Sequence, residues 1–399
     1  SASYNAAIGF QSLYSLTTGS ANTALGRNAL YSATTATNNV AVGSAALYTT
    51  TSSNLTAVGF NAMHFTTTAV NNTAIGYYTL RLNTTGGDNT ALGYYALEAL
   101  TTGTRNTALG SGALKVGTTG TDNVAVGYNT LDALTTGTNN IGVGNNALGL
   151  LTTGFQNVAI GHNSMAAATT TNYNVAVGPY SLEDNTTGTG NVALGSFALN
   201  TVTIGTNNVA LGSYVLDATT ASNNVGVGHS ALTGNTTASN GVAIGFTALY
   251  SNTTGANNVA VGSTALEFNT TGANNVAVGY GAGSFNDLNA SCTFVGYDAD
   301  QSVATDFTNG TAIGNGARLT ASNSARIGDA SVTSIGGYAD WTNVSDGRFK
   351  TDVAATVPGL EFIMALRPVV YHLDIRAINA HLNIADSLID QNAVATKSA

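Results

Sequence analysis

Side chains capable of acid–base, nucleophilic or metal chemistry are scarce in this 399-residue chain, which holds 20 Asp and Glu, 11 Lys and Arg, 5 His and 1 Cys. Cys292 is the only thiol, so it has no partner for an internal disulfide and no second thiol for a zinc site. His64, His162 and His229 fall at unrelated positions, and no Ser-His-Asp or paired-carboxylate grouping recurs. We therefore expect no metal, no cofactor and no catalysis directed at an external substrate.

Calcium binding would need acidic side chains at one fixed repeat position, because Ca²⁺ requires a cage of oxygen ligands in each coil. The aspartates do not share one position: Asp88, Asp122, Asp132, Asp217, Asp287 and Asp298. We expect no array of structural calcium ions.

Tyrosines recur one or two positions after a repeated glycine: Tyr77, Tyr78, Tyr94, Tyr95, Tyr128, Tyr214 and Tyr280. Such a row suits binding of carbohydrate or protein, because the ring supplies contact area and the hydroxyl a directional hydrogen bond. The alternative is ring-on-ring stacking along the edge of the fold. The sequence favours stacking, because Ser, Asn, Phe, His and Arg occupy the same positions in other repeats.

Threonine pairs recur beside glycine, for example Thr84 with Thr85 and Thr101 with Thr102. A regular array of hydroxyls would suit an ice-binding face. In turns, however, threonine hydroxyls more often bond to local backbone, and we favour that role for these pairs.

The net charge is −9, and charged residues make up 8% of the chain, against roughly 25% in an ordinary soluble domain. An acidic chain without a basic face is a poor partner for phosphate backbones, so nucleic-acid binding is not expected. No run approaches the roughly 18 consecutive apolar residues of a membrane span. The first residues also lack the basic and apolar regions of a signal peptide. We expect no membrane-spanning segment.

The elements that would position these side chains follow a 17-residue repeat, aligned on the phrase Asn-Val-Ala-Val-Gly. Fifteen of its 17 intervals are 17 residues, and the two ending at Gly59 and Gly228 are 16. The repeated glycines are Gly9, Gly26, Gly43, Gly59, Gly76, Gly93, Gly110, Gly127, Gly144, Gly161, Gly178, Gly195, Gly212, Gly228, Gly245, Gly262, Gly279 and Gly296. Gly314 and Gly328 continue the series irregularly. Such a repeat predicts a solenoid instead of several globular domains.

Each repeat begins with the alternation of a short strand, in which Val or Thr and then Val, Ile or Leu flank an alanine before the glycine. Glycine allows a corner, an Ala-Leu pair supplies a second apolar anchor, and Thr-Thr-Gly with Asn forms a turn. We expect the larger residues to fill a small interior. The alanines would then lie on the opposite face and line a subunit interface: Ala24, Ala41, Ala57, Ala74, Ala91, Ala108, Ala125, Ala159, Ala176, Ala193, Ala210, Ala243, Ala260 and Ala277.

Seventeen residues suit one β-coil but not a helical hairpin of about 33 residues or a propeller blade of about 40. Stacked coils pair each strand with its copy at roughly 4.8 Å, so about twenty coils give a rod about 95 Å long. The predicted fold is all-β: a parallel β-solenoid or β-roll of about twenty 17-residue coils over residues 1–330.

The phrases Asn-Val-Ala-Val-Gly and Asn-Thr-Ala-Leu-Gly resemble the head repeats of trimeric autotransporter adhesins. The longer phrase Asn-Thr-Ala-Leu-Gly-Tyr-x-Ala-Leu resembles arrays in bacterial surface proteins and phage-like fibres. The resemblance covers about residues 5–330 and implies a left-handed parallel β-roll that assembles as a homotrimer. The period is longer than in adhesin heads, and a leucine column is additional: Leu30, Leu47, Leu80, Leu97, Leu114, Leu131 and Leu148.

The sequence changes character over residues 331–344, which we expect to be a transition. Seven of the 11 basic residues fall at or after Arg318, and the glycine series stops. Residues 341–350 (WTNVSDGRFK), 358–363 (PGLEFI) and 366–371 (LRPVVY) resemble the intramolecular chaperone domain of endosialidases and phage tail spikes.

That resemblance implies that residues 345–399 form a small, α-containing chaperone-like segment, shorter than the usual domain, that assists trimer assembly. In the family this domain often cleaves the peptide bond before a serine that matches Ser345. Ser345 would then be the nucleophile, with Lys350 as its proton-transfer partner. The alternative for Ser345 and Asp346 is a helix N-cap.

The sequence thus predicts an extracellular fibrous protein with an adhesive or structural function, either a cell-surface adhesin or a tail fibre on a virion or similar appendage. Its expected partners are copies of itself in a homotrimer and an unidentified cell-surface receptor, for which a glycan is one candidate. Two alternatives stay open: a self-cleaving fibre precursor that uses Ser345, and a passive spacer stalk.

Overall fold

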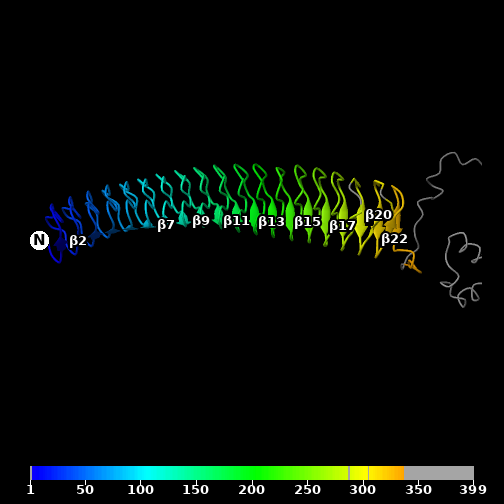
Figure 1. Ribbon diagram of the computed structural model, residues 1–399, viewed down its shortest axis with the longest axis horizontal. Helices are drawn as coiled ribbons and strands as arrows, with labels where there is room; N and C mark the ends of the chain where they lie inside the picture. Colours follow the sequence, from blue (N-terminus) through cyan, green and yellow to red (C-terminus); the bar gives the residue numbers. More distant parts are fainter. Residues whose placement is uncertain (1, 286–287, 304, 337–399) are drawn as a thin grey trace, which may run out of the picture. The chain divides into compact units, whose positions relative to one another are not determined.

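The computed structural model of the protein describes residues 2–285, 288–303 and 305–336. Within them, one β-solenoid runs from residue 6 to residue 327, with coil following coil along a single axis (Figure 1). It has about 19 turns of 17 residues, which confirms the predicted all-β parallel solenoid. The described ranges contain strands, turns and loops but no helix.

Each coil contributes one short strand to a single parallel sheet of 20 strands. These strands are β1 (Ala6–Ile8), β2 (Thr23–Leu25), β3 (Val40–Val42), β4 (Thr56–Val58), β5 (Thr73–Ile75), β6 (Thr90–Leu92), β7 (Thr107–Leu109), β8 (Val124–Val126), β9 (Ile141–Val143), β10 (Val158–Ile160), β11 (Val175–Val177), β12 (Val192–Leu194), β13 (Val209–Leu211), β14 (Val225–Val227), β15 (Val242–Ile244), β16 (Val259–Val261), β17 (Val276–Val278), β18 (Thr293–Val295), β20 (Thr311–Ile313) and β22 (Ala325–Ile327). A second, two-stranded sheet pairs β19 (Asp300–Gln301) with β21 (Arg318–Leu319).

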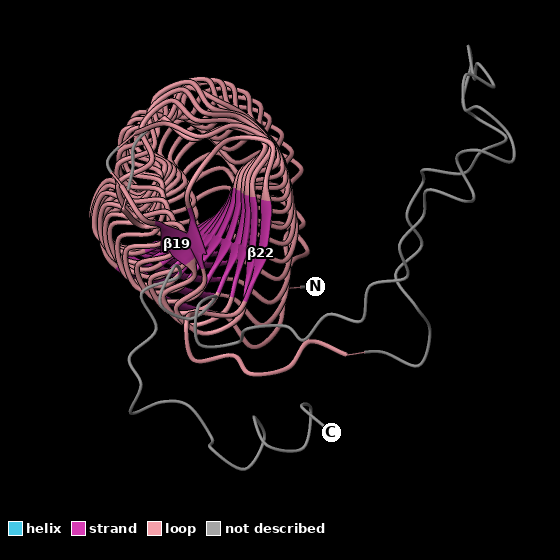
Figure 2. Ribbon diagram, turned by 90° about the vertical axis from the view of Figure 1, so that its right-hand side faces the viewer, coloured by secondary structure: helices cyan, strands magenta, loops and turns pink. Residues whose placement is uncertain are grey.

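Each strand of the large sheet pairs with the strand of the next coil, residue on equivalent residue. Ala159 lies opposite Ala176, one 17-residue repeat away. The 16-residue coils keep this register, since Val40 lies opposite Thr56. Seen along the rod in Figure 2, the strands stack in one wall of each coil and loops close the rest.

The two faces of the strand are the reverse of our expectation. The central alanines are fully buried inside the coil of a single chain, as Ala91 and Ala176 show. The flanking residues point outward, so Leu92 is 47% exposed and Ile75 is 38% exposed. The prediction that the alanines line a subunit interface is therefore wrong.

Where the buried central residue of a strand is not alanine, a neighbouring buried residue changes size in the opposite sense, and we call this compensation volume exchange. It shows that the space inside the strand fits alanine. Gly226 replaces alanine in β14, where an added Cβ would lie 2.4 Å from Cγ1 of Val215. Phe294 replaces alanine in β18, and there Gly283 supplies the space, since a Cβ on it would lie 2.7 Å from the phenylalanine ring. The coil is thus thin and close-packed, with room for little more than a methyl group.

The leucine column is buried, as predicted, and follows the corner glycine by four residues. Leu97 and Met63 are both fully buried. The corner itself requires glycine: Gly127 has φ +139°, and a Cβ on it would lie 2.3 Å from the carbonyl oxygen of Gly144 in the next coil. Successive corners therefore stack backbone on backbone.

A buried ladder of asparagine side chains runs through the interior, which the interpretation of these residues as simple turn formers missed. Asn106 Nδ2 donates to Asn89 Oδ1 (3.1 Å) and to the carbonyl of Gly120 (2.8 Å), while its Oδ1 accepts from the backbone N–H of Asn123 (3.1 Å). The ladder comprises Asn22, Asn39, Asn72, Asn89, Asn106, Asn123, Asn140, Asn157, Asn174, Asn191, Asn208, Asn224, Asn258 and Asn275. Stacked amides of this kind satisfy polar groups that alanine and leucine cannot.

Candidate functional site: the surface of the rod

The residues predicted to carry chemistry, Ser345 and Lys350, lie outside the described residues. Residues 337–344 of the predicted transition (331–344) also lie outside the described residues, as does the whole chaperone-like segment 345–399 with its expected α content. Self-cleavage and assisted assembly therefore stay predictions. The function of the solenoid itself must be sought on its surface.

Groups able to bind a metal are not gathered anywhere in residues 2–285, 288–303 and 305–336, where no three His, Cys, Asp or Glu side chains come together. In the same part of the chain, no helix of sufficient length and apolarity to span a membrane occurs. Cys292 is buried at an asparagine-ladder position, and burial raises the pKa of its thiol. Its Sγ lies 3.4 Å from the carbonyl oxygen of Phe307, so it serves packing and not nucleophilic chemistry.

The outward residues of the strands form two parallel columns, which we call the aliphatic face. The last residue of each strand is aliphatic in all twenty strands, whereas the first residue is Val or Ile in β3 and β8–β17 but Thr in β2, β4, β5, β6, β7, β18 and β20. One column holds the residue three before the corner glycine, and the other holds the residue directly before it. Val124 and Val126 of β8 contribute one residue to each column. Members more than one-third exposed are Ile8, Leu25, Val40, Ile75, Leu92, Ile141, Ile160, Leu194, Leu211, Ile244, Val276, Val278, Ile313 and Ile327.

Aromatic side chains next to the corner stack between coils, which confirms the stacking interpretation over the described runs. Phe60, Tyr77 and Tyr94 follow the corner glycine in three successive coils, with ring centroids 5.3 and 5.4 Å apart and planes within 17°. Tyr280 and Tyr297 stack in the same way at 5.4 Å. Because each ring covers the face of the next, an uninterrupted run exposes mainly ring edges.

The aromatic run ends in a compact cluster around Tyr94 and Tyr95. Their rings meet edge to face at 4.2 Å. A side-chain hydrogen bond with Tyr94, together with burial and neighbouring charges, raises the pKa of Tyr95 to about 12. The Lys115 ammonium lies over the Tyr95 ring, 5.6 Å from its centroid, and closes the outer face of that ring. The face of the Tyr94 ring toward the next coil, which carries Ser111, has no such cover in the described contacts.

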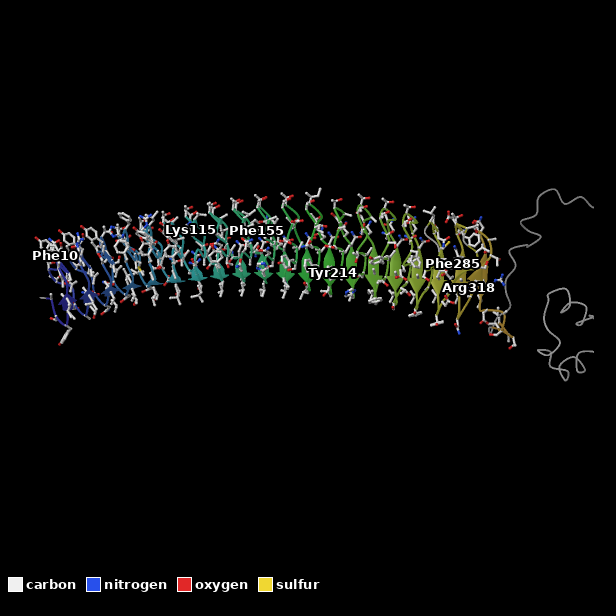
Figure 3. All side chains as sticks on the ribbon, in the orientation of Figure 1. Phe10, Lys115, Phe155, Tyr214, Phe285 and Arg318 are labelled. Atoms are coloured by element: carbon white, nitrogen blue, oxygen red, sulfur yellow. The ribbon has the colours of Figure 1, made fainter. Side chains whose placement is uncertain are left out.

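The few charges of the N-terminal half join consecutive coils. Arg81 pairs with Glu98 at 2.8 Å, and Arg105 pairs with Asp122 at 2.6 Å. The hydrogen bond from Arg105 lowers the pKa of Asp122. Opposite signs thus alternate along the stack, which avoids the repulsion that like charges at one repeat position would create. Lys115 lies within this region, between Phe10 and Phe155 in the N-terminal half of the rod in Figure 3.

The first threonine of each pair bonds to backbone, as expected, but to the next coil and not to its own turn. Thr101 Oγ1 donates to the carbonyl of Thr118 at 2.8 Å, and Thr118 Oγ1 donates to that of Thr135 at 3.1 Å. These hydroxyls stabilise coil stacking and are not free to bind ice.

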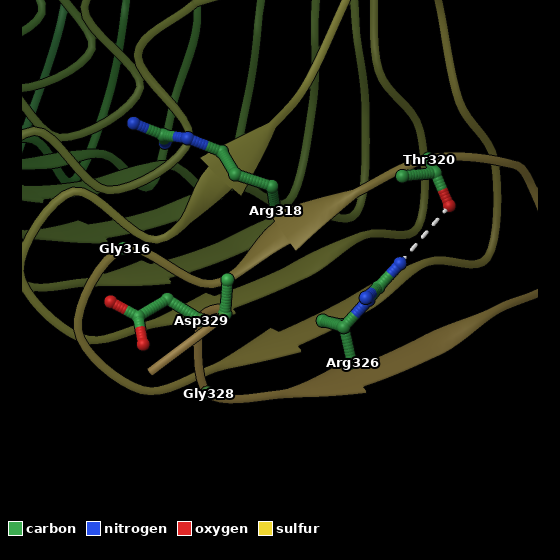
Figure 4. Close-up of a pocket in the computed structure, with 7 residues that line it drawn as sticks. Gly316, Arg318, Thr320, Arg326, Gly328 and Asp329 are labelled. Carbon is green, nitrogen blue, oxygen red and sulfur yellow. Dashed lines mark hydrogen bonds between the residues drawn. The ribbon is translucent and has the colours of Figure 1, made fainter. Parts of the chain in front are cut away.

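A small depression of about 220 Å³ lies at the last coils, lined by Gly316, Arg318, Thr320, Arg326, Gly328, Asp329 and Ala330 (Figure 4). Arg326 reaches Thr320 at 3.5 Å, whereas Arg318 forms an ion pair with Asp298. Asp329 bonds Ser331, which lowers the pKa of its carboxyl. Its polar groups already have partners within the fold.

No protein-family model matches this chain, and a search of curated proteins gave no match. The likeness to adhesin heads and to intramolecular chaperone domains therefore stays a resemblance. The described surface of the rod consists of a long aliphatic face, stacked aromatic rings whose edges are exposed, and ion pairs between consecutive coils.

Proposed function

We propose that this protein is an extracellular fibre with an adhesive or structural function, which works as a homotrimer whose copies meet at the aliphatic face. The exposure of that face carries the proposal. It replaces the alanine column, which is buried within the chain, as the surface between subunits.

The size of the aliphatic face supports self-association. One aliphatic column of twenty strands at roughly 4.8 Å extends over about 95 Å, and the second column doubles its width to about 10 Å over β8–β17, so the aliphatic area is about 700 Å². Monomeric proteins seldom expose an apolar patch above about 600 Å², whereas a stable interface buries about 800 Å² on each partner. Three copies that turn this face toward a common axis would remove it from water.

A fibre of this kind acts at a distance from its point of attachment. We place it on a cell surface or on a virion or similar appendage, as an adhesin or tail fibre, with segment 345–399 assisting trimer assembly. The receptor is a cell-surface molecule.

Sedimentation of the full chain tests the assembly. We expect a trimer mass for the parent protein and a monomer mass for the double variant Leu194→Lys/Ile244→Lys, because six ammonium groups would then be buried at the axis. The matched control is Thr187→Lys, which adds a charge at an exposed turn away from the aliphatic face. A monomeric parent, or a trimer unaffected by the double variant, would contradict the proposal.

A further inference from the structure

The aromatic column beside the corner is interrupted twice by a single serine between two rings. Tyr94 and Tyr128 flank Ser111 in three successive coils, and Phe246 and Tyr280 flank Ser263. We call these two interruptions the ring gaps. Asn145 also separates two rings, Tyr128 and His162, but the His162 ring meets Tyr180 edge to face and does not continue a stack. Longer interruptions occur elsewhere in the column, as at Ser196, whose neighbours in the adjacent coils are Pro179 and Ser213.

Exposure of the flanking rings agrees with an open face at each gap. Tyr77, stacked on both sides, is 41% exposed. Tyr94 and Tyr128 are 54% and 57% exposed, and Phe246 and Tyr280 are 55% and 56% exposed. The faces of Tyr94, Phe246 and Tyr280 that point away from the gaps are stacked on Tyr77, His229 and Tyr297, so each gap lies at the end of a preformed stack.

The width of a ring gap selects the kind of molecule that fits it. Neighbouring rings in the column are 5.4 Å apart, so two steps place the flanking rings about 10 Å apart, close to twice the coil spacing. A flat aromatic ring in contact with both would need only about 7–8 Å, since atoms touch at about 3.5–4.0 Å. A chair-shaped sugar ring is thicker, because C–H bonds project from both of its faces.

We propose that each ring gap binds a neutral pyranose, sandwiched between the two flanking rings with the serine hydroxyl at its edge. This inference rests on the proposed adhesive function and names the class of receptor as a neutral glycan. The sugar C–H groups contact the ring faces, while its hydroxyls reach Ser111 or Ser263 and water.

The charges beside the gaps favour a neutral sugar over an anionic one. Lys115 belongs to the coil of Ser111, whereas Glu267 occupies the equivalent position in the coil of Ser263. Glu98 and Asp132 occupy the same position in the coils on either side of Lys115, so carboxylates outnumber the ammonium group near the first gap, and an acidic sugar would be repelled from both sites. A neutral ring suits both, because ammonium and carboxylate groups both hydrogen-bond to hydroxyls.

Two binding sites on one rod can hold a polysaccharide firmly even if each site binds a single sugar weakly. Ser111 and Ser263 are nine coils apart, which places them about 43 Å from each other at 4.8 Å per coil. A single sugar held by two rings would bind with Kd on the order of 1 mM. A polysaccharide that reaches both gaps gains affinity through the raised effective concentration of its second ring.

Titration of the full chain with the methyl glycosides of glucose, galactose and mannose, followed by saturation-transfer NMR, tests the proposal. We expect at least one glycoside to bind at two sites per chain. Ser111→Tyr should remove one site, and Ser111→Tyr/Ser263→Tyr should weaken binding at least tenfold, because tyrosine completes the stack. Ser196→Tyr is the matched control and should bind as the parent does.

Three results would overturn this inference: no glycoside binds at millimolar concentration, the double variant binds like the parent, or a flat ring such as indole-3-acetamide binds better than every glycoside. The last result would assign the gaps to an aromatic side chain of a protein. Sedimentation of the same samples separates the two proposals. A trimer without sugar binding removes only the ring-gap site, while a monomer removes the proposed assembly.

Discussion

The side-chain amide nitrogen of Asn123 donates to Oδ1 of Asn106 at 3.1 Å, from one coil of the rod to the coil before it. The same oxygen accepts the backbone N–H of Asn123 at 3.1 Å, and Asn123 Nδ2 also donates to the carbonyl of Gly137 at 2.9 Å. One asparagine thus connects three successive coils. Solenoid stability is a sum of such contacts between neighbours.

Replacement of this residue should weaken the rod locally. Asn123→Ala leaves the buried carbonyl of Gly137 and the N–H of Asn140 without the partners they have now. At about 1–3 kcal/mol for each unsatisfied group, we expect a loss of about 3 kcal/mol. Hydrogen exchange of the amides at 120–143 measures it. Asn145→Ala, at an exposed position of the following coil, should change exchange by no more than about 0.5 kcal/mol; equal effects would contradict a structural role of the ladder.

The volume exchange between Val215 and Gly226 predicts a rescue. Gly226→Ala should cost about 1–3 kcal/mol through overpacking against Val215. Val215→Ala/Gly226→Ala restores the alanine pair found in most other coils, so it should recover most of that loss. Thermal unfolding of the parent, both single variants and the double variant gives the coupling energy. Additive effects would show that the strand's central residue does not face the coil interior.

Acid should stabilise the coil that contains Asp300. Burial raises the pKa of this carboxyl to about 6, although the N–H groups of Gln301 and Phe285 and the charge of Arg318 oppose the shift. The folded state therefore holds the proton more tightly than the unfolded state, whose pKa is 3.8. Stability from this group is fully present below about pH 4 and falls as pH rises through 6, by on the order of 2–3 kcal/mol.

Hydrogen exchange at residues 288–301 between pH 4 and pH 7.5, corrected for intrinsic rates, measures this local effect. Asp300→Asn should flatten the pH dependence there. A local readout is necessary, because burial also raises the pKa of Asp132 and Asp217 in other coils. Protection that increases as the pH rises would contradict the expected loss of stability.

Self-cleavage before Ser345 would leave a mass signature. If Ser345 is the nucleophile, the parent chain separates into residues 1–344 and 345–399, while Ser345→Ala stays whole. Lys350→Met should slow the reaction if this amine transfers the proton. Ser334→Ala is the control and should cleave like the parent. Intact mass spectrometry decides the matter, and identical patterns for the parent and Ser345→Ala would remove the claim.

Much of the fold follows from the sequence because the repeat fixes what pairs with what. The 17-residue period predicted the register of Ala159 opposite Ala176, and the spacing of Leu97 from its glycine predicted a buried column. The sequence did not predict correctly which face of each strand points into the coil. A Val-Ala-Val alternation states only that two faces differ, and the rule that large residues lie inside fails where the coil is too thin.

The surface was predicted in part. The tyrosine positions indicated stacking, but the period alone does not distinguish a covered ring such as Tyr77 from an open one such as Tyr94; that depends on whether the next coil carries a ring or Ser111. The asparagine ladder left a signal in its spacing, since Asn89 and Asn106 are one repeat apart. The burial of these side chains could not be predicted without the path of the backbone, because asparagine is also common in exposed turns.

Electron cryomicroscopy of the native rod in cross-section tests the central claim most directly. Our account predicts three copies around one axis, with Leu194, Leu211 and their equivalents in contact at the centre and the ring gaps at Ser111 and Ser263 on the outside. A single coil with its aliphatic face in water, or copies that meet through the turns with that face left exposed, would contradict it.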